Sequence, residues 1–206
     1  MPLQPQSIWE AISSRRSIRR FAPTPLSADV VRELVALACA APAPHGSRPW
    51  RFVYVASAAA RERLIDAMTA AWRADLQRDG QPPNTVAKLL ARSRRQLAGA
   101  PSLLLACLSL VDARAWPDRP RRLAERDMFL QSLGAALQNL LLAAHARGLA
   151  GYLKGAPLFC QEAVARALEL PPDCEPAFLV LLGYPAQGAE PPLRSPVHTD
   201  DLLLQR

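Results

Sequence analysis

The stretch from Leu123 to Arg147 constrains the fold of this chain most, because it predicts one long helix with a continuous apolar stripe. Gly148 follows it, at the position where many helices end on a left-handed residue. Gly134 and Ala135 leave room on this helix for the close approach of another helix. The stripe consists of Leu130, Leu133, Leu137, Leu140, Leu141 and Ala144.

Short apolar stretches elsewhere predict strands. Residues 102–111, SLLLACLSLV, are too short to cross a membrane and indicate a fully buried strand. Further strands are predicted at residues 52–55, at 148–155 between glycines, and at 177–182. With no repeat, linker or shift in composition, 206 residues predict a single domain over 1–206.

Caps and apolar periodicity predict the remaining helices. Ser7 and Glu10 stand at capping-box spacing and open a short helix that runs to Ser14. On the helix predicted over 58–79, Trp72 is expected to point inward with the aliphatic residues. The other helices are predicted from the Ser27 cap to Pro42, over residues 86–97 and over residues 159–168.

Four arginines and two serines crowd into residues 14–21, SRRSIRRF. This is the composition of an anion clamp, because arginine presents a planar fork of donors that matches phosphate oxygens and Ser17 can add a hydroxyl. The local sequence alone favours a solvated basic helix end, where positive side chains offset the helix dipole. The residues alone leave both interpretations open.

The net charge is +7, and Lys88 and Lys154 are the only lysines. Such a chain attracts phosphate or carboxylate groups, although a general bias toward arginine would give the same balance. The cluster at residues 92–95 either is a solvated face or lines an entry for an acidic substrate. Basic and aromatic residues do not alternate on a strand, which disfavours nucleic-acid binding.

Several classes of chemistry find no support in the sequence. The four cysteines have neither CxxC nor Cys/His spacing, so no metal site is expected, and Cys39 and Cys107 are expected as buried thiols. No Ser/His/Asp or paired-carboxylate arrangement is present. The lack of a basic-then-apolar leader or a long apolar run predicts a soluble, cytoplasmic protein without a membrane partner.

Two segments predict recognition surfaces. Residues 41–52, APAPHGSRPWRF, form a shaped loop that leads into a strand, which suits recognition of a flat ring. His45 in this loop is either a base or ligand, or an ordinary loop histidine. The proline-rich tail carries Arg194 and ends apolar at residues 202–204, so it needs a docking place such as a partner subunit.

Taken together, the RRSIRRF segment, the APAPHGSRPWRF loop, the long helix ending at Gly148 and the tail arginine resemble the nitroreductase family of FMN-dependent oxidoreductases. The loop is most similar to that of the C-terminal domain of FbiB, a protein of coenzyme F420 biosynthesis. The resemblance implies an α+β fold with a central mixed or antiparallel sheet flanked by helices. It also implies a homodimer with FMN at the subunit interface and an extended C-terminal arm.

The same resemblance assigns the cofactor residues. Arg15, Arg16 and Ser17 would hold the FMN phosphate and ribityl chain, with Arg19 in support and Arg194 closing on the phosphate. A cation near the flavin N1 and O2 edge would stabilise the anionic reduced ring, and either Lys154 or Arg48 could supply it. The residues implied near the ring are Gly46, Ser47, Arg48, Gln138, Leu153, Lys154 and Gly155.

The family likeness predicts reduction of a dehydro-F420 precursor during coenzyme F420 synthesis, by a hydride donor that the sequence does not identify. Arginines suit such a substrate because it carries phosphate and carboxylates. The alternatives are a general NAD(P)H-dependent nitro or quinone reductase and a binding module without turnover for F420 or nucleic acid. The residues expected to contact substrate are His45, Arg51, Arg92 and Arg95.

Overall fold

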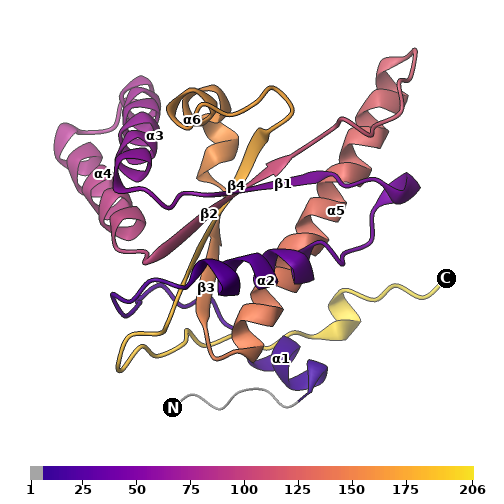
Figure 1. Ribbon diagram of the computed structural model, residues 1–206, viewed down its shortest axis with the longest axis horizontal. Coiled ribbons are helices and arrows are strands. Elements are labelled where there is room, and N and C mark those ends of the chain that lie inside the picture. Colours follow the sequence, from indigo (N-terminus) through magenta and orange to yellow (C-terminus); the bar gives the residue numbers. More distant parts are fainter. Residues whose placement is uncertain (1–6) are drawn as a thin grey trace.

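The computed structural model describes residues 7–206 and places helices on both faces of a four-stranded sheet (Figure 1). All strand pairs are antiparallel, in the order β1-β2-β4-β3. The α+β architecture expected from the sequence is therefore confirmed, with an antiparallel sheet. The strands are β1 (Trp50–Tyr54), β2 (Ser102–Leu108), β3 (Ala150–Lys154) and β4 (Glu175–Gly183).

Several helices begin after a residue whose side chain accepts from a first-turn N–H group. Ser7 and Glu10 form the predicted capping box at the start of α1. The longest helix begins at Arg119, four residues before the predicted start, because the Asp118 side chain accepts from the Arg121 N–H. The helices are α1 (Ile8–Ser14), α2 (Ala28–Ala38), α3 (Ala58–Arg78), α4 (Pro83–Ala98), α5 (Arg119–Ala146) and α6 (Gln161–Ala167), with 3-10 turns η1 (Pro44–Gly46), η2 (Ala156–Phe159) and η3 (Thr199–Asp201).

Strand β2 separates two apolar cores, because successive side chains of a strand point to opposite faces. Leu103 and Leu105 pack in the core that includes residues of α3 and α6. Leu104 and Ala106 pack in the core that includes α2 and α5. Every residue of β2 is buried as predicted, but the strand ends at Leu108 rather than at residue 111, and Val111 is 63% exposed. Figure 1 shows α3 and α4 on one side of the sheet and α5 on the other.

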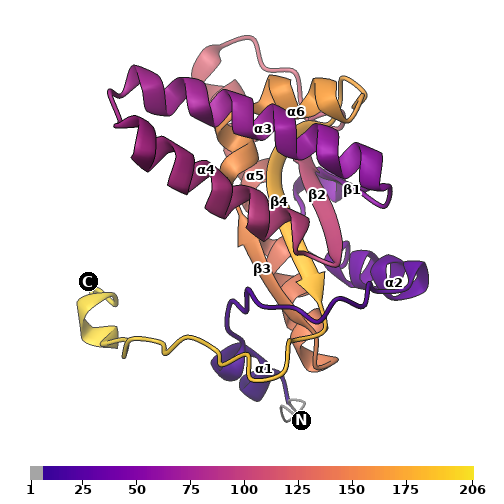
Figure 2. The same ribbon diagram turned by 90° about the vertical axis from the view of Figure 1, so that its left-hand side faces the viewer.

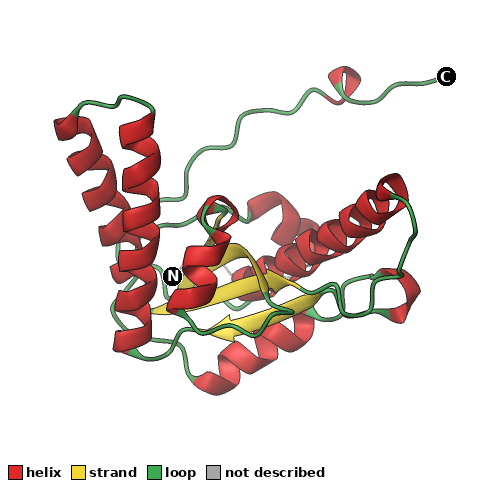
Figure 3. Ribbon diagram, turned by 90° about the horizontal axis from the view of Figure 1, so that it is seen from above, coloured by secondary structure: helices red, strands yellow, loops and turns green. Residues whose placement is uncertain are grey.

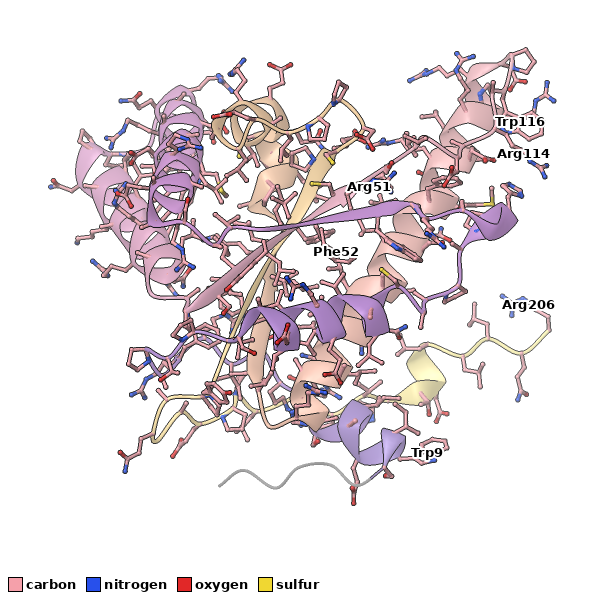
Figure 4. The ribbon with its side chains drawn as sticks, in the orientation of Figure 1. Trp9, Arg51, Phe52, Arg114, Trp116 and Arg206 are labelled. Atoms are coloured by element: carbon pink, nitrogen blue, oxygen red, sulfur yellow. The ribbon has the colours of Figure 1, made fainter. Side chains whose placement is uncertain are left out.

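Within residues 7–206, part of one side of α5 is exposed to solvent. Gln138 is exposed there, and a Cβ added at Gly134 would meet nothing within 4 Å. The nearby α1 also exposes apolar surface, since Trp9 is 82% exposed and lies at its outer rim (Figure 4). The helix that organises the fold thus keeps an open face.

The C-terminal arm, residues 189–206, leaves the body of the molecule (Figures 2 and 3). Its base is tied to the segment after α1 by a bridge between Phe21 and Pro185 and by the Ala186 N–H, which donates to the Arg20 carbonyl. Farther along, Leu193 is fully exposed and residues 202–204 are mostly exposed. The arm has the extended form that the sequence predicted.

Two expectations about burial were wrong. Trp72 is 37% exposed, because its position on α3 faces a cavity beside η2 rather than the sheet. Cys39 is exposed because α2 ends at Ala38 and the apolar periodicity ends with it, whereas Cys107 is buried as expected. No helix within residues 7–206 has the length and hydropathy that a bilayer crossing requires.

Candidate cofactor site

Arginines from the segment after α1 and from the C-terminal arm meet at Arg15. Nη1 of Arg15 is buried and has no hydrogen-bond partner within residues 7–206. Arg194 of the C-terminal arm donates through Nη2 to the Arg15 carbonyl oxygen at 3.0 Å, and Arg16 donates through Nη1 to the same oxygen at 3.0 Å. We name Arg15, Arg16 and Arg194 the arginine clamp.

The clamp is electrostatically uncompensated. Burial, and after it the charges of Arg194 and Arg16, lower the pKa of Arg15. No ion pair joins any of these three arginines to a carboxylate in the described part of the chain. Like charges held together around an unpartnered donor fit an anion such as a phosphate.

Ser17 and Arg19, the other two residues of the predicted phosphate site, lie between the clamp and strand β3. Arg19 donates to the Ser17 carbonyl at 3.3 Å, and its guanidinium lies 5.2 Å from the ring centroid of Tyr152. Tyr152 also stacks on Phe21 with centroids 6.2 Å apart, and its buried hydroxyl has no hydrogen-bond partner in the described part of the chain. Sequence reasoning missed Tyr152, because only the pairing of β3 with β4 brings it beneath Arg19.

A second polar centre lies where β3 ends. Lys154 donates through Nζ to Ser93 Oγ at 2.7 Å and to Gln96 Oε1 at 3.4 Å, both on α4. Burial, and after it the charge of Arg92, lower the pKa of Lys154. An ammonium group has three N–H donors, so one remains for a ligand. Ser93 and Gln96 were not predicted, although their i,i+3 spacing places them on one helix face.

The arginine clamp and the polar centre at Lys154 lie along the same edge of the sheet. Tyr152 and Lys154 point to one face of β3, two residues and therefore about 7 Å apart. β3 is an outer strand of the described sheet, so part of its backbone faces away from β4 and can bond a ligand. Leu153 and Gly155 belong to this segment. An elongated molecule with an anionic end at the clamp could lie along β3 and reach Lys154.

A cavity of about 670 Å³ opens beside Lys154 and Gly155. Trp72 and Phe159 supply aromatic surface, and the polar wall includes Asp75, which pairs with Arg78 at 3.0 Å. This volume is typical of a small-molecule site. The remaining lining residues are Met68, Thr69, Asp79, Ser93, Leu97, Ala156 and Cys160.

The proline loop lies elsewhere. It precedes β1, the outer strand on the opposite edge from β3, and three strand spacings amount to about 14 Å. Gly46 has a φ of 68°, Ser47 Oγ donates to the Pro44 carbonyl at 2.6 Å, and the Arg48 N–H donates to Asp112 Oδ2 at 3.1 Å. Within one chain, residues 46–48 are therefore apart from Lys154.

The loop is anchored to the N-terminal part of α5 through a buried carboxylate. Glu125 accepts from the Arg114 N–H at 3.0 Å and from Trp116 Nε1 at 3.1 Å, and these bonds are the main reason that its pKa is lowered. His45 Nε2 lies 3.5 Å from Glu125 Oε1, and the His45 backbone has a φ of 60°. Figure 4 shows Arg114 and Trp116 at this end of α5.

The residues predicted to contact substrate occupy three separate places. Arg51 pairs with Asp173 at 3.3 Å on the β1 side of the molecule (Figure 4), away from the β3 edge. Arg92 and Arg95 are exposed on α4, and only Arg92 is close enough to Lys154 to affect its pKa. His45 is in the loop, and Gln138, predicted near the ring, is on the open face of α5. One chain does not gather these side chains.

A model of the family described as "Nitroreductase family" matches residues 12–184. The chain belongs to the nitroreductase family. The match runs from α1 to the end of β4, so it includes the first arginines of the clamp, the proline loop and Lys154.

Relatives of this nitroreductase-family chain match over nearly their full lengths. YfhC of Bacillus subtilis strain 168, provisionally named an NAD(P)H nitroreductase, is 28% identical over 188 residues, which are 91% of this chain and 89% of YfhC. A BluB-like flavoprotein from Clostridium difficile 630 has the same fold, with a TM-score of 0.78, 21% identity and coverage of 98% and 100%. A protein of Desulfovibrio desulfuricans, provisionally named a nitroreductase and solved with FMN, has a TM-score of 0.70, 25% identity and 98% coverage of both chains.

Proposed function

We propose that this nitroreductase-family chain is an FMN-dependent oxidoreductase whose cofactor lies along β3. The buried, unpartnered Nη1 of Arg15 carries the proposal, because it marks a place where a phosphate satisfies a donor that the protein leaves open. The relative from Desulfovibrio desulfuricans was solved with FMN, which supports the identity of the cofactor. Bound FMN supplies hydride transfer at its N5 atom.

The protein's own residues bind the cofactor and tune its charge in this proposal. Arg15, Arg16 and Arg194 bind the phosphate through charge-assisted hydrogen bonds, while β3 orients the ring. Lys154, held by Ser93 and Gln96, places a positive charge where the reduced ring becomes anionic. Arg48 is the other candidate for this charge, and it requires a second copy of the chain.

The active unit in this proposal is a homodimer. Residues 46–48 and Lys154 lie on opposite edges of one sheet, so both can reach one ring only if different copies supply them. The open face of α5 and the exposed apolar residues of the C-terminal arm support an extensive contact between copies. The FMN would then lie at the subunit interface.

For the substrate we favour an anionic molecule, the dehydro-F420 precursor of coenzyme F420 biosynthesis. The likeness of the APAPH loop and the exposed arginines Arg48 and Arg92 support it, because the precursor carries phosphate and carboxylates. A general NAD(P)H-dependent nitro or quinone reductase is the second candidate. The name of YfhC and the aromatic wall formed by Trp72 and Phe159 support this alternative.

The proposal is tested first by binding and then by turnover. The purified protein should bind FMN more tightly than riboflavin, and Arg15→Gln should remove this difference while Arg20→Gln keeps it. Equal affinity for FMN and riboflavin in the unaltered protein would exclude the phosphate site. With FMN bound, turnover of dehydro-F420 is then compared with NAD(P)H oxidation by nitroaromatics, and faster nitroaromatic turnover selects the second candidate.

A further inference from the structure

His145, in the last turn of α5, lies beside the arginine clamp. Its Nε2 is 2.8 Å from Oγ of Ser14, the last residue of α1. The Ser14 hydroxyl also donates to the Glu10 carbonyl oxygen. A hydroxyl has one hydrogen, and Ser14 uses it to bond the Glu10 carbonyl oxygen. The Ser14 oxygen must therefore accept a hydrogen bond from Nε2 of His145, which leaves Nδ1 of the neutral imidazole unprotonated. Any additional proton is then taken up at Nδ1.

The charges around His145 come from several elements. Burial, and after it the charges of Arg15 and Arg16, lower the pKa of His145. Arg194 adds a positive charge from the arm, next to Arg15. On the adjoining helices, Arg147 of α5 pairs with Glu33 of α2, Arg32 of α2 pairs with Asp29, and the Glu10 carboxylate of α1 accepts from the Ser7 N–H. Repulsion from the clamp therefore opposes a positive charge on His145.

We propose that His145 belongs to the phosphate end of the cofactor site and takes up a proton when the phosphate binds. A phosphate monoester brings a charge of nearly −2 at neutral pH, which cancels the repulsion from Arg15 and Arg16. The imidazolium then keeps its Nε2 bond to Ser14 and adds a positive charge at the end of α5, where the helix dipole favours a cation. This inference rests on the proposed function, because the phosphate in question is that of FMN.

The sign of the pH dependence follows from the two states of His145. Without phosphate the pKa of His145 is below the ordinary 6.5. In the proposal, bound phosphate raises it. Between these two values, a fall in pH strengthens FMN binding by up to about tenfold per pH unit for one proton. Protonation of the phosphate itself near pH 6 weakens binding, but it does so equally in a His145 variant.

The test measures proton uptake on binding by calorimetry near pH 6.5, in two buffers that differ in ionisation enthalpy. FMN binding to the unaltered apoprotein should take up a fraction of a proton more than FMN binding to His145→Gln. His198→Gln, in the exposed tail, serves as the matched control and should behave as the unaltered protein. Riboflavin, which lacks the phosphate, should bind without this uptake in all three proteins.

Equal proton uptake by His145→Gln and the unaltered protein would overturn the inference while leaving the proposed function intact. Absence of FMN binding to the unaltered protein would instead defeat the proposed function. If His145→Gln does not fold, NMR titration of the unaltered protein decides, because the chain has only three histidines. The pKa of His145 should then rise on addition of FMN and stay constant on addition of riboflavin, and an unchanged value with FMN would overturn the inference.

Discussion

Nη2 of Arg194 donates to the carbonyl oxygen of Arg15 at 3.0 Å and so joins the C-terminal arm to the segment that follows α1. We predict that Arg194→Ala weakens FMN binding by about tenfold, because it removes one charge-assisted contact from the phosphate site. Fluorescence titration of the apoprotein measures this. Arg206→Ala, at the end of the same arm (Figure 4), should bind FMN normally. Unchanged FMN affinity in Arg194→Ala would exclude the residue from the clamp.

Lys154 offers a sharp test of flavin tuning, because Lys88 is the only other lysine and is exposed. Lys154→Met should lower the two-electron potential of the bound flavin by about 30 mV or more, equivalent to about 1.4 kcal/mol. Lys154→Arg should lower the potential much less than Lys154→Met does, and Lys88→Met should leave the potential unchanged. Spectroelectrochemical titration measures the three variants. If Lys154→Met and Lys88→Met had the same potential, Lys154 would not be the residue that tunes the flavin.

The open face of α5 predicts where two copies meet. Gly134→Arg should abolish the dimer, because the new side chain stands where another helix would approach, while the chain itself has space for it. Ala74→Arg, on the exposed side of α3, is the matched control. Sedimentation velocity distinguishes the two variants. A fully dimeric Gly134→Arg protein would place the interface on another surface.

We expect Glu125 to make the stability of the folded protein depend on pH in the acid range. Hydrogen bonds from the Arg114 N–H and Trp116 hold its pKa below 4.5, so its stabilising effect is complete above about pH 4.5 and is lost as pH falls through the lowered pKa. Glu125→Gln should therefore be less stable than the unaltered protein at pH 7, and the two stabilities should converge as the pH falls through the lowered pKa of Glu125. Urea unfolding at a series of pH values measures the difference. A constant difference across this range would contradict the prediction.

Gly183, at the end of β4, has no room for a side chain. A Cβ there would be 2.3 Å from Pro101 Cγ and 3.2 Å from Phe21 Cδ1. Gly183→Ala should lower the free energy of unfolding by about 1–3 kcal/mol, the usual cost of overpacking. Ala74→Ser, on the exposed side of α3, is the control, with urea unfolding of both variants measured at one protein concentration. Equal stability of the two variants would mean that Pro101 moves away freely.

The sequence could predict the elements whose signals are local. The apolar stripe of α5, the uninterrupted apolar run of β2 and the capping box at Ser7 each depend on residues near one another in the chain, and the structure confirms all three. The start of α5 was less predictable, because Pro117 and Pro120 indicate a loop. A proline in the first helical turn costs no hydrogen bond, so the helix extends back to Arg119.

The site itself was predictable only in part. Family resemblance implies Arg15, Arg194 and Lys154 as cofactor residues, which stays a prediction, but the neighbours of these residues depend on contacts between distant segments. The side chain of Lys154 bonds Ser93 across the distance from β3 to α4, and His145 reaches Ser14 because α1 packs on α5. Such pairings depend on strand register and helix crossing, which leave no local signal.

The strand order has a consequence for how the protein is made. β2 can pair with β1 as soon as both have left the ribosome. The other edge of β2 stays unpaired until β4 is synthesised, and β4 follows α5, β3 and α6 in the chain. Until then an uncharged apolar segment around Leu104 presents an open edge, a template for pairing with other nascent chains. Rapid overproduction should therefore favour inclusion bodies, and slower synthesis in the cold should increase the soluble yield.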